Sequence, residues 1–257
     1  MHDDVRLVRG ERRVYYTKDR VKDALELPET GLGLVANEPL IAMPSLHCQA
    51  ILFDLDGVLL DSVELSERLW CEFAEKHDLD AERILAIHHG RRGVETVSMV
   101  APHLLEVFEH EEREWEAGND LRGLKAYPGA IALLGQLPDD RWGIVTSGTH
   151  RIATTRMAYV GLPQPEVLVT ADQVTHGKPH PEPYATGMAR IGVHSADCVV
   201  FEDASAGVAS AKAAGAHVVA IASTTPIEEL QAADVVVERL SDVKIAVSAE
   251  GLTVSWR

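Results

Sequence analysis

Short, continuous apolar runs alternate with amphipathic segments along most of the chain. The runs are rich in valine and isoleucine, as is typical of parallel strands that helices cover on both faces. They predict strands at residues 50–54, 142–146, 166–169, 198–202, 217–221 and 234–236. The amphipathic segments predict helices near residues 129–137, 150–160, 181–191, 205–214 and 226–231. This alternation predicts an α/β fold with a doubly wound parallel sheet and right-handed crossovers, which is a Rossmann-like core.

One interval breaks the alternation. Residues 64–126 contain no convincing strand pattern, so we expect an inserted α-helical cap domain between the first and second core strands. Helical periodicity is present in Leu65–Lys76, Ala81–Ile87, Val94–Val100 and Leu104–Trp115. The acidic run Glu109–Glu116 is interpreted as a solvated face of that cap.

The same pattern sets the domain boundaries. The core domain is predicted to comprise residues 47–63 and 127–245, with the cap at 64–126. Residues 1–46 mix charges with weak periodicity, so they are predicted to be an N-terminal extension that is disordered or not native to the domain. Residues 246–257 are assigned as a C-terminal tail.

The composition fits an ordinary folded domain and excludes several classes of protein. The chain has 257 residues, of which 46% are apolar, and a formal net charge of −16. Such an acidic chain is not expected to bind nucleic acid, which selects basic surfaces. An apolar run of about 18 residues and a signal-peptide pattern are both absent, so no membrane association is expected. Three cysteines without metal-ligand spacing favour reduced thiols and a cytoplasmic location.

Two aspartates stand directly after the first predicted strand. The apolar run Ala50–Phe53 leads into Asp54, Leu55, Asp56 and Gly57. In an extended chain residues i and i+2 project to the same side, so both carboxylates can face one point. Gly57 permits a sharp turn or a close approach. Two acids aimed at one place are costly unless a cation or a reaction uses them, which favours an active site.

Three further polar segments end later strands, at the edge where open α/β sheets bind ligands. Ser147 and Gly148 offer a hydroxyl and backbone N–H groups for phosphate oxygens, although the segment is also a helix N-cap signal. Lys178, between glycine and proline, is either rigidly placed or exposed in a surface loop. Glu202 and Asp203 repeat the pair of acids, a pattern that also caps helices.

In combination these segments predict a magnesium–phosphoryl site. Carboxylates from two strand ends can together bind Mg²⁺, which prefers oxygen ligands. A fixed lysine and hydroxyl or backbone donors can neutralise a phosphoryl group beside it. The remaining aspartate can then attack phosphorus.

The order of these motifs resembles the haloacid dehalogenase superfamily, over about residues 48–240. The matching segments are Asp-x-Asp-Gly at 54–57, Ser-Gly at 147–148, Gly-Lys-Pro at 177–179 and Glu-Asp at 202–203. His89-Gly90-Arg91-Arg92 and the stretch Tyr127–Ala130 are similar to bacterial sugar phosphatases and to yeast 2-deoxyglucose-6-phosphate and glycerol-phosphate phosphatases. The resemblance implies a Mg²⁺-dependent phosphoric monoester hydrolase acting on a small sugar or polyol phosphate. It is compatible with a monomer.

The resemblance also implies roles for the acids. Asp54 is the expected nucleophile, which forms an aspartyl-phosphate intermediate. Asp56 is the expected general acid and then general base. The metal ligands are expected to be Asp54, the backbone carbonyl of Asp56, and Asp203, with Glu202 nearby or bound through water.

Five residues are expected to contact the phosphoryl group or substrate. By resemblance, Ser147, Gly148 and Lys178 bind phosphoryl oxygens, and Lys178 also restrains the nucleophile. His89 and Arg92 of the cap are expected to face the core site across the cleft. For the histidines at 88 and 89, a solvated pair at a helix end is the alternative.

Two other functions remain open from the sequence. A phosphomutase of the β-phosphoglucomutase type shares the fold, the cap and all four motifs, but it returns the phosphoryl group instead of passing it to water. A non-catalytic phosphate-binding regulator is disfavoured, because Asp54, Asp56, Lys178 and Asp203 are all present.

Overall fold

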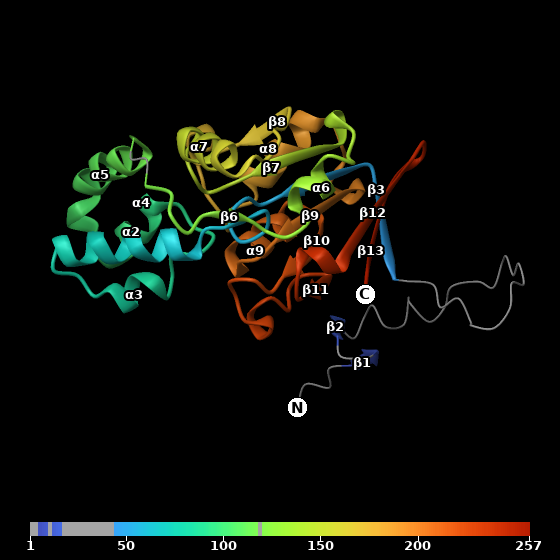
Figure 1. The fold of residues 1–257 in the computed structure, drawn as a ribbon, viewed down its shortest axis with the longest axis horizontal. Helices are drawn as coiled ribbons and strands as arrows, with labels where there is room; N and C mark the ends of the chain where they lie inside the picture. The colour runs from blue at the N-terminus through green and yellow to red at the C-terminus, as the bar shows by residue number, and fades with distance from the viewer. Residues whose placement is uncertain (1–4, 10–11, 17–43, 118–119) are drawn as a thin grey trace, which may run out of the picture.

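The core of the molecule is a mostly parallel sheet. A computed structural model describes residues 5–9, 12–16, 44–117 and 120–257 (Figure 1). The parallel strands follow the order β11-β10-β9-β4-β7-β8. Their bounds are β4 Ala50–Phe53, β7 Trp142–Val145, β8 Val167–Val169, β9 Cys198–Glu202, β10 His217–Ile221 and β11 Val235–Val237. A strand therefore lies at each of the six positions that the apolar runs predict.

Helices cover both faces of this sheet, as a doubly wound fold requires. Every residue of β4, β7 and β9 is buried, which explains why these strands read as unbroken apolar runs. In β4, Ile51 and Phe53 pack into one hydrophobic cluster and Leu52 into the other. The covering helices are α6 Ala130–Leu134, α7 His150–Val160, α8 Glu182–Ile191 and α9 Ser205–Ala213. The predicted α/β fold class is confirmed.

The cap follows the first core strand. A two-stranded ribbon, β5 Leu60–Asp61 with β6 Lys125–Ala126, joins it to the core. Between these strands lie α2 Val63–Lys76, α3 Ala81–Leu85, α4 Gly93–Val100 and α5 Leu105–Ala117. In Figure 1 the cap forms one end of the molecule, away from β12 and β13. Among the described residues, no helix is both long and apolar enough to cross a bilayer.

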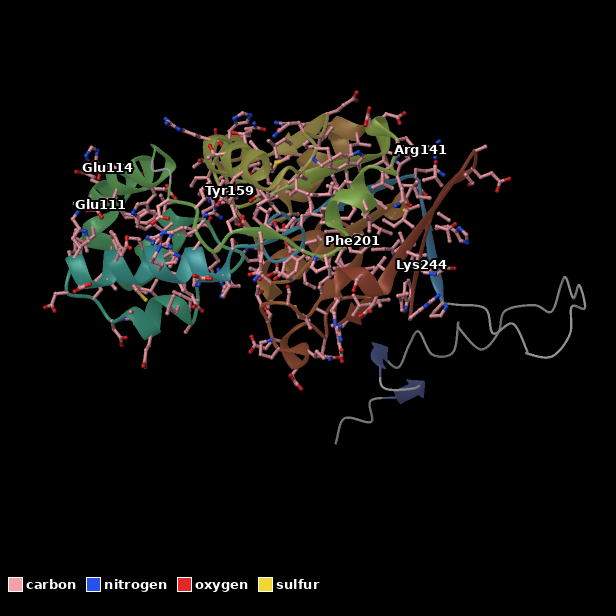
Figure 2. The ribbon with its side chains drawn as sticks, in the orientation of Figure 1. Glu111, Glu114, Arg141, Tyr159, Phe201 and Lys244 are labelled. Carbon is pink, nitrogen blue, oxygen red and sulfur yellow. The ribbon has the colours of Figure 1, made fainter. Side chains whose placement is uncertain are left out.

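Aromatic side chains hold the cap together. Trp70 and Phe108 stack with their ring centroids 5.3 Å apart, and Phe73 meets Phe108 edge-on. The acidic run on α5 is only partly a solvated face, contrary to the sequence interpretation. Glu114 is exposed, whereas Glu111 is buried and pairs with Lys76 and His77 (both glutamates are labelled in Figure 2). A run of like charges can therefore hide one residue that packs inward.

Two segments differ from the sequence pattern. The segment predicted as a C-terminal tail, 246–257, holds the end of β12 Val243–Ser248 and all of β13 Gly251–Trp256, and the two strands form an antiparallel hairpin. β13 also pairs with β3 Ser45–Cys48. The helix predicted at 226–231 is a short 3₁₀ turn, Ile227–Glu229.

Most of the predicted N-terminal extension, residues 1–46, lies outside the described residues. Within it, β1 Val5–Arg9 and β2 Arg12–Tyr16 pair antiparallel, and β2 pairs with β11 at the edge of the main sheet.

The C-terminal hairpin is expected to contribute to stability through its inward face. Val254 of β13 is fully buried, whereas Val247 of β12 is 45% exposed. Val254→Ala removes buried methyl groups and leaves a cavity, so it should lower the free energy of unfolding by about 1–3 kcal/mol. Val247→Ala makes the same chemical change on the surface and should change the free energy of unfolding by about 0.5 kcal/mol or less. Urea unfolding of the two variants measures both values; equal effects would show that the hairpin does not share the core.

Candidate active site

The carboxyl ends of neighbouring parallel strands bring together a lysine and two acids. Asp54 follows β4, Glu202 ends β9, and Lys178 enters from the loop before α8. Lys178 Nζ donates to Asp54 Oδ1 at 2.6 Å and to Glu202 Oε1 at 2.7 Å. The Lys178 side chain is 1% exposed. The surface-loop alternative for this lysine is therefore wrong.

Two further contacts fix the lysine. Its Nζ also donates to the carbonyl oxygen of Val145, the last residue of β7, at 3.2 Å. The ammonium lies 4.9 Å from the ring centroid of Tyr184 on α8. Lys178 thus contacts the ends of β4, β7 and β9 at once, and its three N–H donors are all used.

Glu202 is a fully bonded acid. Its Oε1 accepts from Lys178 and from the Tyr184 hydroxyl, which lies 2.7 Å away. Its Oε2 accepts from the backbone N–H groups of Asp203 and Ala204. A Cβ at Gly207 would lie 1.7 Å from Glu202 Oε1, so this position of α9 has no room for a side chain. Glu202 therefore holds the lysine and the next loop in place.

Asp203, in contrast, has one carboxylate oxygen without a hydrogen bond from the described residues. Its Oδ2 accepts from the hydroxyl of Thr224, whereas its buried Oδ1 has no hydrogen-bond partner among the described residues. Gly57 lies directly against this carboxylate: its φ is +87°, and a Cβ there would lie 2.0 Å from Asp203 Oδ2. The glycine predicted for a close approach is thus explained by both its backbone conformation and its neighbour.

The arrangement fits a divalent cation. Ligand oxygens of Asp54, Glu202 and Asp203 lie within 4.8 Å of one another. An unpartnered buried carboxylate oxygen is expensive unless something binds it, and hard cations select such oxygens. Because both oxygens of Glu202 already accept bonds, Asp54 and Asp203 are the members of this group best able to ligate a metal directly.

Electrostatics in this group favour added positive charge. Burial raises the pKa of Asp54 to about 7, despite the lowering effect of Lys178, and Glu202 adds to the rise. Burial, with the charges of Glu202 and Asp54, also raises the pKa of Asp203 well above its usual range. Burial alone would lower the pKa of Lys178, but the carboxylates outweigh it and raise the pKa. One ammonium among three buried acids leaves negative charge that a cation would offset.

Asp56 has a different environment. Its Oδ1 accepts from Arg156 Nη1 of α7 at 2.6 Å, and the two side chains are 28% and 15% exposed. Asp56 does not belong to the buried group around Lys178, which agrees with a separate task for it. Arg156 lies on α7, outside all four motif segments.

The segment after β7 is already hydrogen-bonded. Ser147 Oγ donates to the carbonyl oxygen of Gly90 in the cap at 2.9 Å. The backbone N–H of Gly148 donates to Thr146 Oγ1 at 3.1 Å, and Thr149 caps α7 by accepting from Ile152. The helix-cap alternative is therefore realised by Thr149, next to the predicted phosphate ligands Ser147 and Gly148.

The cap loop closes directly onto the core beside Asp203. Gly90 has φ +72°, and a Cβ there would lie 2.5 Å from the Cβ of Ala204. Arg92 pairs with Glu95 of the cap through contacts of 2.5 and 2.8 Å, and its Nη1 donates to the Thr175 carbonyl of the core. Arg92 thus lies between the cap and the core, and its guanidinium is bonded to protein groups.

The neighbouring histidines are partly buried. Burial lowers the pKa of His89, against the opposing influence of Glu67 and Asp56. Burial lowers the pKa of His88 to about 3. The ring centroids of His88 and His89 lie 3.9 Å apart. The alternative of a solvated histidine pair is wrong, since His88 is buried and His89 is half-buried.

A helical cap over a carboxylate–lysine site at the ends of parallel strands defines a capped α/β enzyme. A family model described as haloacid dehalogenase-like hydrolase matches residues 48–215, and the chain belongs to this family. The predicted family resemblance is confirmed, and the chain is a hydrolase.

The relatives agree with this assignment. Hexitol phosphatase A of Escherichia coli is 38% identical over 211 residues, which cover 80% of this chain and 98% of that protein. Glycerol-1-phosphate phosphohydrolase 2 of Saccharomyces cerevisiae is 34% identical over 219 residues, covering 78% and 86%. The crystal structure of a hydrolase from Pseudomonas syringae matches with a TM-score of 0.65 and 28% identity, covering 74% and 93%.

The buried lysine should decide whether the site can fold with its acids ionised. Lys178→Met leaves Asp54 and Glu202 without their shared cation, so we expect a loss of about 3–5 kcal/mol at about pH 8 with chelator present. A carboxyl whose pKa is raised by folding takes up a proton as the pH falls, so the loss should shrink at about pH 5.5.

Urea unfolding at both pH values measures these losses. Lys244→Met, on the exposed face of β12 (Figure 2), is the matched control and should change the free energy of unfolding by about 0.5 kcal/mol or less at either pH. A Lys178→Met loss that does not depend on pH would contradict the charge argument.

Proposed function

We propose that the protein is a Mg²⁺-dependent phosphatase that hydrolyses a small sugar or polyol phosphate through an aspartyl-phosphate intermediate. The observation that carries this proposal is that three aspartates of the site have three different environments. Asp54 is held at one oxygen by Lys178, Asp203 keeps a buried oxygen without a partner, and Asp56 stands apart with Arg156. A nucleophile, a metal ligand and a proton carrier need these three environments.

The first step transfers the phosphoryl group to the enzyme. Lys178 occupies Asp54 Oδ1, which leaves Oδ2 to form the new bond to phosphorus. The bond from phosphorus to the ester oxygen breaks, and Asp56 gives its proton to the departing alkoxide, so an alcohol leaves. Lys178 orients the carboxylate during this step through its bond to Asp54 Oδ1.

The second step returns the enzyme to its starting state. Asp56, now a carboxylate, accepts a proton from water while the water oxygen attacks phosphorus. The bond between phosphorus and Asp54 breaks, and inorganic phosphate forms. The proton that Asp56 donates in the first step is thus recovered in the second, so Asp56 acts first as a general acid and then as a general base.

Mg²⁺ would be held by Asp54, the backbone carbonyl of Asp56, and Asp203. Bound there, it supplies positive charge that offsets the charge of the phosphoryl oxygens. Glu202 contributes charge and fixes the loop of Asp203 through its bonds to backbone N–H groups. Thr224 holds the second oxygen of Asp203 and so orients the first.

The close contact between the cap and the core favours a small substrate. The Gly90 loop touches Ala204, the residue after Asp203, so little space separates the cap loop from the metal-binding loop. His89 and Arg92 stand at this boundary and are proposed to contact the substrate, with Arg92 exchanging its bonds to Glu95 and Thr175. Ser147 is proposed to exchange its bond to Gly90 for a phosphoryl oxygen. The named activities of the curated relatives support a hexitol or glycerol phosphate as substrate.

The nucleophile assignment is tested by Asp54→Asn. An amide cannot form the acyl phosphate, so phosphate release should fall by at least about a thousandfold, equal to about 4 kcal/mol in barrier. The exposed Asp140 lies just before the amino end of β7 and offers the matched change Asp140→Asn, which should alter the rate less than about twofold. Circular dichroism confirms the fold of both variants. An Asp54→Asn rate within about tenfold of the unsubstituted enzyme would contradict the assignment.

The reaction type and metal dependence are tested on a substrate panel. Free phosphate should be released from hexose, hexitol or glycerol phosphates in the presence of Mg²⁺, and a chelator should abolish the release until Mg²⁺ is restored. Colorimetric phosphate assay and mass spectrometry follow both products. An isomerised sugar phosphate without free phosphate would establish a mutase instead, and phosphate binding without turnover would establish a regulator.

A further inference from the structure

A second ion pair joins the site to a helix that carries none of the motif residues. Arg156 lies on α7 and reaches Asp56, which is 100 positions earlier in the chain. Its Nη1 lies 2.6 Å from Asp56 Oδ1, and the arginine side chain is 15% exposed. This is the only hydrogen bond of the Arg156 guanidinium within the described part of the chain.

The burial and geometry distinguish this pair from an ordinary surface ion pair. Exposed pairs have mobile partners and contribute little, because water screens the charges. Here both side chains are largely withdrawn from solvent, and the contact is a short, charge-assisted hydrogen bond. Arg151, five residues earlier on the same helix, is exposed to solvent. Of these two arginines on α7, Arg156 is the one that is withdrawn from solvent and bonded to Asp56.

The bond constrains one oxygen of Asp56 and leaves the other for chemistry. A short aspartate side chain with one oxygen fixed has one defined direction for its second oxygen. Arginine stays protonated in proteins, so Arg156 cannot deliver the proton itself. Any effect of Arg156 on the reaction through this contact must therefore pass through Asp56.

We propose that Arg156 is a positioning residue that fixes the Asp56 carboxyl so that Oδ2 faces the oxygen of the leaving alcohol. The proposal rests on the proposed phosphatase function, in which Asp56 protonates that oxygen as its bond to phosphorus breaks. Alignment of a proton donor within hydrogen-bond reach of the departing atom is what makes general acid catalysis effective. Arg156 supplies this alignment from outside the motifs.

The leaving group provides a readout that a purely structural role would not move. An alkoxide from glycerol 1-phosphate needs a proton as it departs, whereas p-nitrophenolate is stable without one. Arg156→Met should therefore lower kcat/KM for glycerol 1-phosphate by about 10- to 100-fold and for p-nitrophenyl phosphate by less than about threefold. Arg156→Lys keeps the charge but not the planar fork, so it should recover only part of the loss.

A double-mutant cycle tests whether the effect passes through Asp56. In an Asp56→Asn background, Arg156→Met should change kcat/KM for glycerol 1-phosphate by less than about twofold, because there is no proton donor left to position. Arg151→Met is the matched control on the exposed side of α7 and should leave both substrates unaffected. Thermal unfolding of each variant shows whether its fold is retained.

The outcomes separate this inference from the proposed function. Unequal losses for the two substrates, together with non-additivity, support positioning. Equal losses for both substrates, or a full Arg156→Met loss in the Asp56→Asn background, would overturn it in favour of direct substrate contact by Arg156. No loss for either substrate would also overturn it, while the unsubstituted enzyme still releases phosphate. An unsubstituted enzyme that hydrolyses neither substrate but isomerises a sugar phosphate contradicts the proposed function and with it this inference.

Discussion

The buried ammonium of Lys178 is the constraint on which the rest of the site depends. It needs anionic partners because it is withdrawn from water, and Asp54 and Glu202 need it for the same reason. Replacing all members of a buried ion group together with apolar side chains often stabilises a protein, so stability alone does not explain why this group is present. What the lysine provides is position: it fixes the oxygen of Asp54, the end of β7 and, through Glu202, the loop that carries Asp203.

Much of the core fold could be predicted because burial on both faces of a parallel sheet leaves a simple signature. Short apolar runs at β4, β9 and β10, separated by helical patterns, are typical of such buried strands. The hairpin β12–β13 was missed although apolar and polar residues alternate over Leu252–Trp256, because the predicted strands were continuous apolar runs and β12 is mostly exposed. The burial of β13 depends on β3, which lies about 200 residues away in sequence, and local patterns carry no information about such a partner.

The motifs locate the central acids and the lysine but not the residues that orient them. Lys178 could be placed because glycine and proline flank it in a family pattern. Arg156 and Thr224 lie within an ordinary helix and an ordinary loop, and only the folded chain brings them to Asp56 and Asp203. For Arg92, the motif predicts a substrate contact, whereas its pairing with Glu95 depends on side-chain geometry that sequence spacing does not encode.

The contact between Gly90 and Ala204 also affects how the sequence can change over evolutionary time. Gly90 belongs to the cap and Ala204 to the loop of Asp203, yet position 90 has no room for a side chain while Ala204 is unchanged. A side chain at position 90 of the cap therefore depends on a change in the loop of Asp203. A lineage that remodels its cap would need to retain Gly90 or shift the Asp203 loop at the same time.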